Sequence, residues 1–354
     1  MRSAHWSELP TDVLAVLRRG AVIPAHPLAL DEERRFDRTS QRALSRYYID
    51  AGSGGLAVGV HATQFKIRDV GLYRPVLELA AETAASWTKG PLMMIAGVIG
   101  KTSQALEEAR TARALGYHAA LLGVSAMQGA SEDELIAHCS AVAGEVPLIG
   151  FYLQTAVGGI PLSRSFWTRF AAIDNVIAIK VAPFNRYRTL DVAFGVAAAG
   201  AEERVTLYTG NDDHIVADLV TPFHVRVGKR QVTLRFKGGL LGHWSVWTRS
   251  AVTLLESVRG CIGTGTVPEA ILALDSQVTD CNSVIFDVEH DFAGCIPGCH
   301  EILRRQGLMG TTHCLDPKEV LSPGQAAGID RLYATYPNLV DDDFVRENLS
   351  SWRG

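Results

Sequence analysis

Short apolar runs alternate with helix-like stretches along most of the chain, and this alternation is the feature that most restricts its fold. Apolar runs bounded by turn residues and separated by helical patterns are typical of βα units, which build parallel sheets. Eight such units predict an α/β fold, a closed (β/α)8 TIM barrel. The expected strands span residues 21–27, 55–60, 91–98, 119–124, 147–153, 176–182, 205–210 and 238–246.

An open, doubly wound sheet is the alternative, but no expected strand runs into the Gly-x-Gly-x-x-Gly turn that favours it. Residues 221–236 alternate like a hairpin around Gly228 and interrupt the βα series. After residue 247 the pattern is helical to the end, which is more chain than a barrel needs. We therefore expect a catalytic barrel domain over residues 1–250 and a C-terminal helical extension over residues 251–354.

Charge and composition exclude several classes of protein. The 354 residues carry a net charge of −4 and contain six cysteines, and the sequence pI is near 6.3. This balance gives no electrostatic footprint for nucleic acid. No segment reaches the roughly 18 apolar residues of a membrane span, and the start has no run of signal-peptide length. Few cysteines in a long chain are typical of a reduced setting, so we expect a cytoplasmic protein.

The stretch "NVIAIKVAP" places one lysine, Lys180, inside an apolar strand. Side chains alternate along a strand, so Lys180 shares a face with Ala178 and Ala182, and these small residues leave room for it in the barrel lumen. Burial lowers the pKa of a lysine and makes its neutral, nucleophilic amine accessible. Such an amine condenses with a carbonyl to form an imine. The alternatives are that Lys180 pairs with a buried carboxylate or extends to the rim.

Strand 147–153 offers a second reactive group. Leu148, Gly150 and Tyr152 share one face, which puts a tyrosine near the end of the strand. Neighbouring strands lie roughly 4.8 Å apart. We therefore expect Tyr152 to meet Lys180 at the C-terminal mouth of the barrel, where barrel enzymes place their chemistry. In that position the phenol would move protons as a general acid or base.

Six segments in order resemble the dihydrodipicolinate synthase / N-acetylneuraminate lyase family of class I aldolases. They are "GGLAVGVHATQF", "MIAGVIGKTSQALEEARTARALGYHAALL", "LIGFYLQTAVGG", "NVIAIKVAP", "LYTGNDD" and "GGLLGHWSV", and the resemblance covers about residues 15–260. It implies that Lys180 forms the imine and that Tyr152 is the catalytic tyrosine. It also places Gly210 after the seventh strand and Trp244 beside the bound keto acid.

The sequence departs from the family where the substrate is held. The Gly-Thr-Thr-Gly-Glu turn that cradles the keto-acid carboxylate reads Gly59-Val60-His61-Ala62-Thr63 here. His61 and Thr63 are candidates to donate in its place, or His61 is a rim residue that contacts only its neighbours. The second tyrosine of the synthase falls near Met127, and the arginine that recognises the second substrate is absent. These departures argue against true dihydrodipicolinate synthase activity and against plain sialic acid cleavage.

Two further clusters are weaker candidates. Cys295 and Cys299 lie four residues apart and precede His300, and thiolates at that spacing can share a helix face. The Cys-x2-Cys pairs of zinc ribbons are missing, however, and free cysteine is commonly buried, so we expect no metal site. Asp212 and Asp213 follow the seventh strand, where a carboxylate commonly caps the next helix.

The sequence therefore predicts a Schiff-base lyase, an aldolase or hydro-lyase, for a 2-oxo acid or related carbonyl compound. Lys180 is its nucleophile and Tyr152 its proton shuttle, and the substrate is bound by Gly59, His61, Thr63, Gly210 and Trp244. No metal or organic cofactor is needed, because the lysine itself takes up the electrons. The resemblance implies a homo-oligomer, a dimer or tetramer. The alternative is a barrel that has lost catalysis and binds a small ligand.

Overall fold

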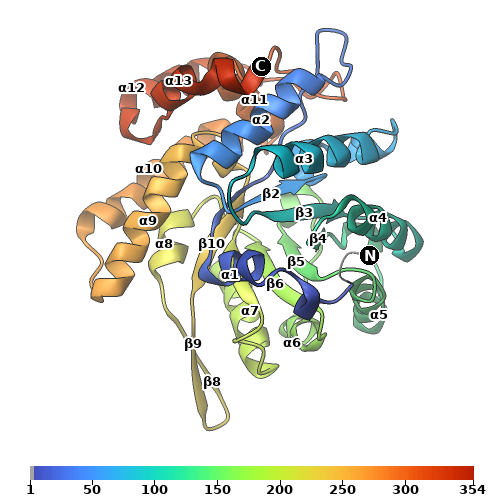
Figure 1. The fold of residues 1–354 in the computed structure, drawn as a ribbon. Coiled ribbons are helices and arrows are strands. Elements are labelled where there is room, and N and C mark those ends of the chain that lie inside the picture. Colours follow the sequence, from blue (N-terminus) through green and yellow to red (C-terminus); the bar gives the residue numbers. More distant parts are fainter. Residues whose placement is uncertain (1–3) are drawn as a thin grey trace.

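A computed structural model describes residues 4–354 and shows eight parallel strands arranged as a barrel (Figure 1). Parallel pairing runs continuously from β2 through β3, β4, β5, β6, β7 and β10 to β1. The ring closes between β1 and β2, because Ala25 bridges Ala57 and the N–H of His26 donates to the carbonyl of Ala57 at 2.8 Å. The strands are β1 (Val22–Pro24), β2 (Gly55–Val58), β3 (Met93–Val98), β4 (Ala119–Leu122), β5 (Leu148–Leu153), β6 (Val176–Ala182), β7 (Thr206–Thr209) and β10 (Phe236–Leu241).

Helices surround the barrel and fill the gaps between successive strands. The predicted (β/α)8 barrel is thus confirmed. The helices up to the end of the barrel are α1 (Thr11–Arg19), α2 (Arg38–Ala51), α3 (Tyr73–Trp87), α4 (Thr102–Leu115), α5 (Glu132–Ala143), α6 (Arg164–Ala172), α7 (Arg186–Ala198), α8 (Ile215–Val220) and α9 (Thr248–Thr264). The 3-10 turns are η1 (Trp6–Glu8), η2 (His61–Thr63), η3 (Phe65–Arg68), η4 (Ser125–Met127), η5 (Thr155–Val157), η6 (His243–Ser245), η7 (Val288–His290) and η8 (Pro337–Leu339).

The buried side chains form two separate clusters. The larger lies between the strands and the helices, and the smaller fills the lumen, as expected when strand residues alternate between the two sides. At the N-terminal end of the lumen, Leu14 and Leu17 of α1 join the smaller cluster. The hydroxyl of Tyr208 donates to the carbonyl of Leu17 at 2.8 Å. The lumen is therefore closed at this end and open only at the other.

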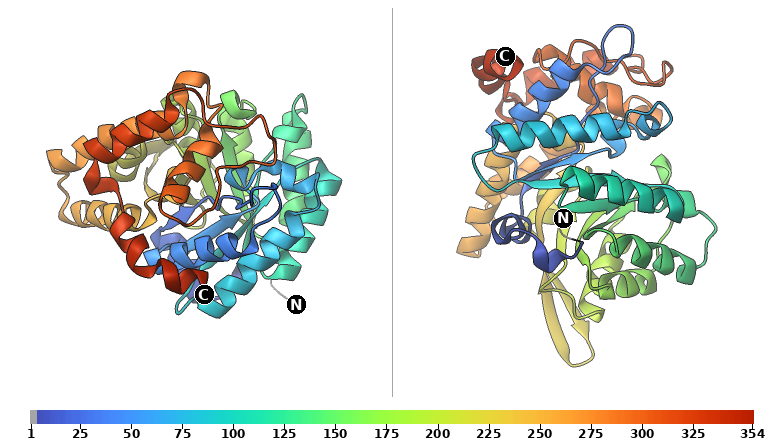
Figure 2. Two further views of the ribbon diagram at one scale, coloured as in Figure 1. Left: turned by 90° about the horizontal axis from the view of Figure 1, so that it is seen from above. Right: turned by 45° about the vertical axis from the view of Figure 1, so that its right-hand side comes forward.

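The helical tail covers the open end. Seen from above in Figure 2, the segment after α9 lies over the barrel opening. Its residues Phe286, Phe292 and Ile296 face the same pocket as the C-terminal ends of the strands. The predicted boundary at residue 250 falls inside α9, and a division into two domains stays a prediction. The helices of the tail are α10 (Glu269–Ile285), α11 (Cys295–Arg305), α12 (Gln325–Thr335) and α13 (Asp342–Arg353).

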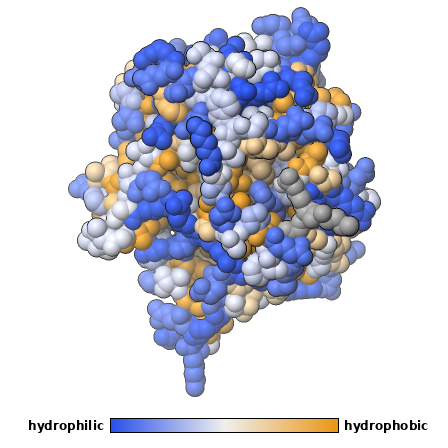
Figure 3. Space-filling view, in the orientation of Figure 1, coloured by the Kyte–Doolittle hydropathy of each residue, from blue (hydrophilic) through white to orange (hydrophobic). Residues whose placement is uncertain are grey.

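The predicted hairpin forms β8 (Phe223–Val227) and β9 (Arg230–Leu234), which pair antiparallel around a turn with Gly228 at a φ of +59°. Val225 and Val232 are buried, and the alternate residues point outward. The hairpin projects away from the C-terminal helices (Figure 1), and hydrophilic side chains cover its tip (Figure 3). It lies at the end of the molecule far from the pocket.

Helix α2 begins at Arg38, because Asp37 caps it and accepts hydrogen bonds from the N–H groups of Thr39 and Ser40. Among the expected strands, the last one differs most from the structure. The strand expected over residues 238–246 ends at Leu241, and the next residues turn into η6. Within residues 4–354, no helix is long and apolar enough to cross a membrane.

Candidate active site

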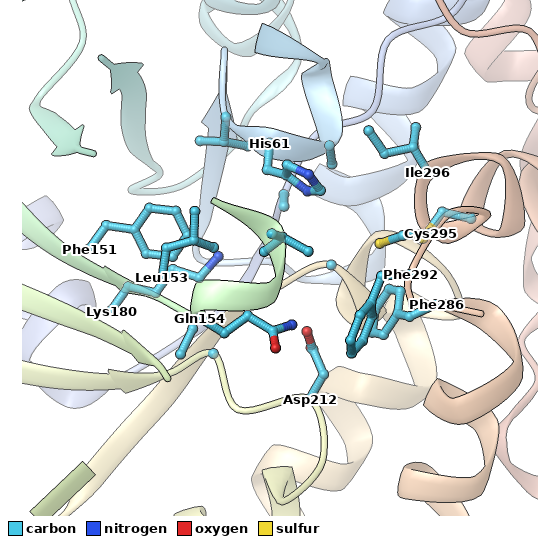
Figure 4. A pocket seen from close by; sticks show the side chains of 18 of the residues that line it. His61, Phe151, Leu153, Gln154, Lys180, Asp212, Phe286, Phe292, Cys295 and Ile296 are labelled. Atoms are coloured by element: carbon cyan, nitrogen blue, oxygen red, sulfur yellow. The ribbon is translucent and has the colours of Figure 1, made fainter. Parts of the chain in front are cut away.

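A pocket of about 740 Å³, part of it open to solvent, lies at the C-terminal mouth of the barrel (Figure 4). Residues at the ends of the strands form its floor and sides, among them Ala25, His61, Leu153, Lys180, Gly210 and Gly242. Residues of the helical tail form its far wall. This is the end of the barrel at which such folds carry their chemistry.

Lys180 extends from β6 into this pocket, as the sequence predicts. Its neighbours Ala178 and Ala182 belong to the lumen cluster, whereas Ile179 and Val181 pack in the outer cluster. Strict alternation would put Val176 on the lumen side with Lys180 and Ile177 on the outer side, but Val176 lies in the outer cluster and Ile177 in the lumen cluster. The β5–β6 register shifts at this point, so the two residues exchange sides.

Glycine is required at position 210 by the approach of the lysine. A Cβ atom at Gly210 would lie 2.8 Å from Cε of Lys180 and 2.8 Å from Cβ of Ala182. Any larger residue would displace the lysine side chain. Gly210 follows β7 and lines the pocket with Lys180.

The amine of Lys180 is buried without an ion pair. The residue is 8% exposed, and its Nζ lies 4.4 Å from the centroid of the Phe151 ring. Within residues 4–354, no carboxylate oxygen lies within 4.0 Å of this nitrogen. Desolvation lowers the pKa of Lys180 to about 8, although the negative charge of Asp212 raises it in part. At pH 7 about one tenth of such an amine is neutral, compared with less than about one thousandth at the ordinary lysine pKa.

The predicted contact between Tyr152 and Lys180 is wrong. The register of β5 and β6 places Phe151 beside Lys180 and Tyr152 beside Val181. Because side chains alternate, the ring of Phe151 faces the lumen and the ring of Tyr152 faces the helices. There Tyr152 packs against Trp167 of α6, with ring centroids 5.1 Å apart.

The hydroxyl of Tyr152 is fully engaged in the outer layer. It donates to the carbonyl of Leu162 at 3.2 Å and accepts from the N–H of Leu162 at 3.3 Å. It also accepts from the guanidinium of Arg188 at 2.9 Å. The phenol thus holds the loop after β5, and it does not line the pocket.

Three other predicted pocket residues also lie elsewhere. Trp244 is fully buried in the outer cluster, because the chain turns into η6 before it. Thr63 is fully buried, and its hydroxyl donates to the carbonyl of His26 at 2.6 Å. The same oxygen accepts from the N–H groups of Gly59 and Val60 at 2.9 and 3.2 Å. Thr63 and Gly59 therefore fix the turn after β2 and do not line the pocket.

His61 does line the pocket, as predicted. Its side chain points into the pocket in Figure 4 and is partly exposed. Burial, followed by the positive charge of Lys180, lowers the pKa of His61 to about 4. The imidazole is therefore neutral at neutral pH and offers one N–H donor and one acceptor nitrogen.

Asp212 is the pocket residue that sequence reasoning missed as a partner of Lys180. Asp212 as a whole is partly exposed, but its Oδ1 atom is buried and has no hydrogen-bond partner within residues 4–354. Burial raises the pKa of Asp212 to about 7, against the opposing effect of the Lys180 charge. Both groups thus have pKa values near neutrality, which is typical of groups that exchange protons in catalysis.

The loop after β7 holds Asp212 in position. The amide of Asn282 in α10 donates to the backbone carbonyl of Asp212 at 2.6 Å. The amide of the preceding residue, Asn211, donates to the carboxylate of Asp218 at 2.9 Å. Asp213, in contrast, is exposed. The two adjacent aspartates diverge, and neither side chain makes a cap bond to α8.

Cys295, Cys299 and His300 form part of the pocket wall contributed by α11. Burial raises the pKa of Cys295 and of Cys299, so both are neutral thiols, and it lowers the pKa of His300 to about 4. In the part of the chain that the structure describes, no group of three or more His, Cys, Asp or Glu side chains is arranged to hold a metal ion.

Comparisons with known proteins identify the family of this chain. The model of the dihydrodipicolinate synthetase family matches residues 19–229, which is more than half of the chain. The chain belongs to this family. Its members are Schiff-base lyases, and the resemblance inferred from the six sequence segments is confirmed.

Among curated relatives, N-acetylneuraminate lyase 2 of Escherichia coli O6:H1 is 23% identical over 315 residues, or 88% of this chain and 91% of the relative. The 4-hydroxy-tetrahydrodipicolinate synthase of Exiguobacterium sibiricum is 32% identical over 142 residues, or 39% of this chain and 46% of the relative.

Solved structures share the fold at low identity. One is a prophage protein of the dihydrodipicolinic acid synthase family from E. coli K12, in complex with pyruvate. Its TM-score is 0.72 at 18% sequence identity, and the match covers 90% of this chain and 97% of the prophage protein's chain. The Clostridium difficile protein CdNal, in complex with mannosamine, has a TM-score of 0.71 at 15% identity, with coverage of 90% and 99%.

Proposed function

We propose that the protein is a Schiff-base-forming lyase, an aldolase or hydro-lyase, that acts on a 2-oxo acid or a related carbonyl compound. The observation that supports this most is the amine of Lys180, which is buried at the base of the pocket, has a lowered pKa and makes no ion pair. Membership of a lyase family and the pyruvate complex of one structural neighbour are consistent with it.

The reaction begins at Lys180. The neutral amine attacks the carbonyl carbon, and a C–N bond forms while the carbonyl oxygen takes up a proton. A second proton transfer releases that oxygen as water and leaves a protonated imine. In an aldol cleavage the imine accepts the electron pair of the bond between the α and β carbons, while the hydroxyl on the β carbon loses its proton and becomes a carbonyl. In a dehydration the imine accepts the electron pair of the α C–H bond, and the enamine so formed expels the β oxygen, which leaves as water after it takes up a proton. Protonation of the enamine, where one remains, and hydrolysis of the imine then regenerate the amine. Each of these steps needs a group that moves protons beside the nitrogen.

We assign that proton-moving role to Asp212, because Tyr152 does not reach the pocket. Asp212 lines the pocket with Lys180, its Oδ1 has no partner, and its loop is anchored to α10. His61 is placed to donate to the substrate as a neutral imidazole. We do not expect 4-hydroxy-tetrahydrodipicolinate synthase activity, because no arginine or tyrosine from residues 4–354 lines this pocket.

Reductive trapping tests the proposal directly. The protein is incubated with borohydride and a panel of carbonyl compounds that includes pyruvate, and the adduct is located by peptide mass spectrometry. We expect an adduct on Lys180 in the native protein and none in Lys180→Met. Lys101 is an exposed lysine, so Lys101→Met is the matched control and retains the adduct.

If no compound of a broad panel forms an adduct on Lys180, the proposed Schiff-base activity is contradicted. Such a result would favour a barrel that binds a small ligand without catalysis, which calorimetry with the same compounds would then detect. The cytoplasmic location and the dimeric or tetrameric assembly stay predictions from the sequence.

A further inference from the structure

Large apolar side chains of the helical tail face Lys180 across the pocket. Figure 4 shows Lys180 on one side of the pocket and Phe286, Phe292 and Ile296 on the other. These three residues come from the helical tail. The barrel side contributes the polar side chains of His61, Gln154, Lys180 and Asp212, and the tail adds Cys295, Cys299 and His300. A substrate held at Lys180 by its carbonyl carbon therefore extends its remaining atoms toward phenyl rings and an aliphatic side chain. The full apolar lining comprises Val60, Ala62, Phe151, Leu153, Val157, Phe184, Phe286, Phe292 and Ile296, with the small residues of the strand ends.

The pocket lining offers few partners for a polar tail. Of the described residues in the lining, Lys180 and Asp212 have pKa values near neutrality, and His61 and His300 are neutral because burial lowers their pKa values. The amide of Gln154 lies beside Asp212 in Figure 4, and the buried Nε2 of His300 has no partner among the described residues. Once Lys180 is bonded to the carbonyl carbon, it cannot pair with a group on the tail, and the negative charge of Asp212 repels a second carboxylate. Hydroxyl or carboxylate groups that lose water against Phe286, Phe292 and Ile296 find no partner in these three side chains, which is costly.

Two aromatic rings meet at the pocket from opposite sides. Phe184 follows β6, and Phe292 precedes α11, and their ring centroids lie 6.2 Å apart at an interplanar angle of 71°. This is the edge-to-face arrangement that aromatic rings prefer. The pair joins the barrel to the helical tail beside the substrate space.

Both rings are held by strained backbone. Phe184 has a φ of +49° and Phe292 a φ of +68°, in the left-handed region that bulky residues rarely adopt. Each is fixed by a backbone hydrogen bond: Phe184 N–H donates to Oδ1 of Asn211, and Phe292 N–H donates to the carbonyl of Asp287, both at 3.0 Å. Such conformations persist where the surroundings determine them and are concentrated at functional sites.

We propose that the substrate of this site carries an apolar tail, an aromatic or branched alkyl group beyond the reacting carbonyl, and that Phe292 selects it. The proposal rests on the proposed function, because it takes the carbonyl to be bound at Lys180. Polyhydroxylated tails and tails with a second carboxylate are selected against.

Imine trapping with matched tails tests the proposal whatever bond the enzyme breaks. The half-saturation concentration for borohydride trapping at Lys180 is measured with pyruvate, 2-oxo-4-phenylbutanoate, 2-oxoglutarate and a polyhydroxylated 2-oxo acid. We expect the phenyl compound to saturate at a concentration at least about tenfold below the two polar compounds, as apolar pockets discriminate. Pyruvate has almost no tail and serves as the common reference. Equal or tighter saturation by either polar compound overturns the proposal.

A variant series locates the selectivity. Phe292→Asn keeps a residue that tolerates the left-handed backbone and removes the ring, so the preference for the phenyl compound over pyruvate should fall at least about fivefold. Phe194→Ala is the matched control, because that ring lies on α7 against Arg164, 4.2 Å from the guanidinium carbon, and does not line the pocket. Equal losses for pyruvate and the phenyl compound in Phe292→Asn contradict a tail-selecting role.

The outcomes separate the two proposals. Failure of pyruvate and all other compounds to modify Lys180 contradicts the Schiff-base function itself. Modification of Lys180 with a preference for polar tails leaves that function intact and overturns only the apolar specificity.

Discussion

Strands β5 and β6 bury one polar side chain on their outer face, Tyr152, and one on their lumen face, Lys180. The two side chains differ in whether they have polar partners. On the outer face the hydroxyl of Tyr152 has three hydrogen-bond contacts, to both backbone groups of Leu162 and to Arg188. On the lumen face the amine of Lys180 lies over the ring of Phe151 and has no ion pair within the described chain. A buried polar group with partners stabilises the fold, whereas one without them costs stability and stays reactive. The comparison therefore assigns structure to Tyr152 and chemistry to Lys180.

The largest expected effect comes from removing the amine. Lys180→Met should abolish imine trapping and turnover completely, because no other lysine lines the pocket within residues 4–354. The melting temperature should stay the same or rise, since the change removes a desolvated ammonium and keeps an apolar chain of similar length. Differential scanning calorimetry and mass spectrometry measure the two effects. A loss of stability above about 2 kcal/mol would show that the amine has a structural partner.

Asp212→Asn should have the next largest effect. Turnover should fall by about 10² to 10⁴, the usual contribution of a general acid or base, while the trapped adduct on Lys180 still forms. The steady-state rate of turnover is measured with a compound of the panel that borohydride trapping has identified as forming the imine. Asp213→Asn is the matched control, because Asp213 is the exposed neighbour, and it should stay within about twofold of the native rate. Equal losses in the two variants would remove Asp212 from the mechanism.

The same pair of variants predicts a pH shift. The rate of trapping should rise with pH through about 8, because only the neutral form of Lys180 attacks the carbonyl. The charge of Asp212 raises the pKa of Lys180, so Asp212→Asn should move the midpoint to lower pH. Initial trapping rates between pH 6 and about 10 give the midpoint. An unchanged or higher midpoint would mean that the two groups do not interact.

Thr63→Val should reduce stability and leave the chemistry of Lys180 intact. The Thr63 hydroxyl bonds to the carbonyl of His26 and to the N–H groups of Gly59 and Val60. Valine leaves these buried groups unpaired, and we expect a loss of about 2–3 kcal/mol in the free energy of unfolding. Urea denaturation measures it. If stability is retained and trapping of 2-oxo acids is lost, Thr63 binds substrate, as the sequence predicts.

The sequence predicted the barrel well, because the fold depends on patterns that repeat. Eight apolar runs, each followed by a helical segment, leave few other arrangements. The position of Lys180 was equally predictable, since small residues on either side mark the lumen face of β6. Gly210 followed from the resemblance, and its close approach to Cε of Lys180 explains it.

The face of β5 was the main error, and its reason is physical. "LIGFYL" carries adjacent aromatic residues, Phe151 and Tyr152, so alternation alone does not say which ring faces inward. The signal was Gly150: a Cβ there would lie 2.6 Å from the ring of Phe170 in α6, so this side of the strand faces helices. The partnership of Asp212 with Lys180 depends on a loop conformation fixed by Asn282, seventy residues away, which no local pattern contains.

Tyr152→Phe has the smallest expected effect and tests the comparison most sharply. Removal of one hydroxyl leaves the ring packed against Trp167 and takes a partner from both Leu162 and Arg188. We expect a loss of about 1 kcal/mol in the free energy of unfolding and a change below about twofold in the rate of imine trapping at Lys180. The phenol is separated from the pocket by the strand itself, so it has no path to a proton on the substrate. A loss of turnover by two orders of magnitude, with stability unchanged, would mean that β5 turns its other face to the lumen in the working enzyme. The assignment of proton transfer to Asp212 would then have to be abandoned in favour of the tyrosine.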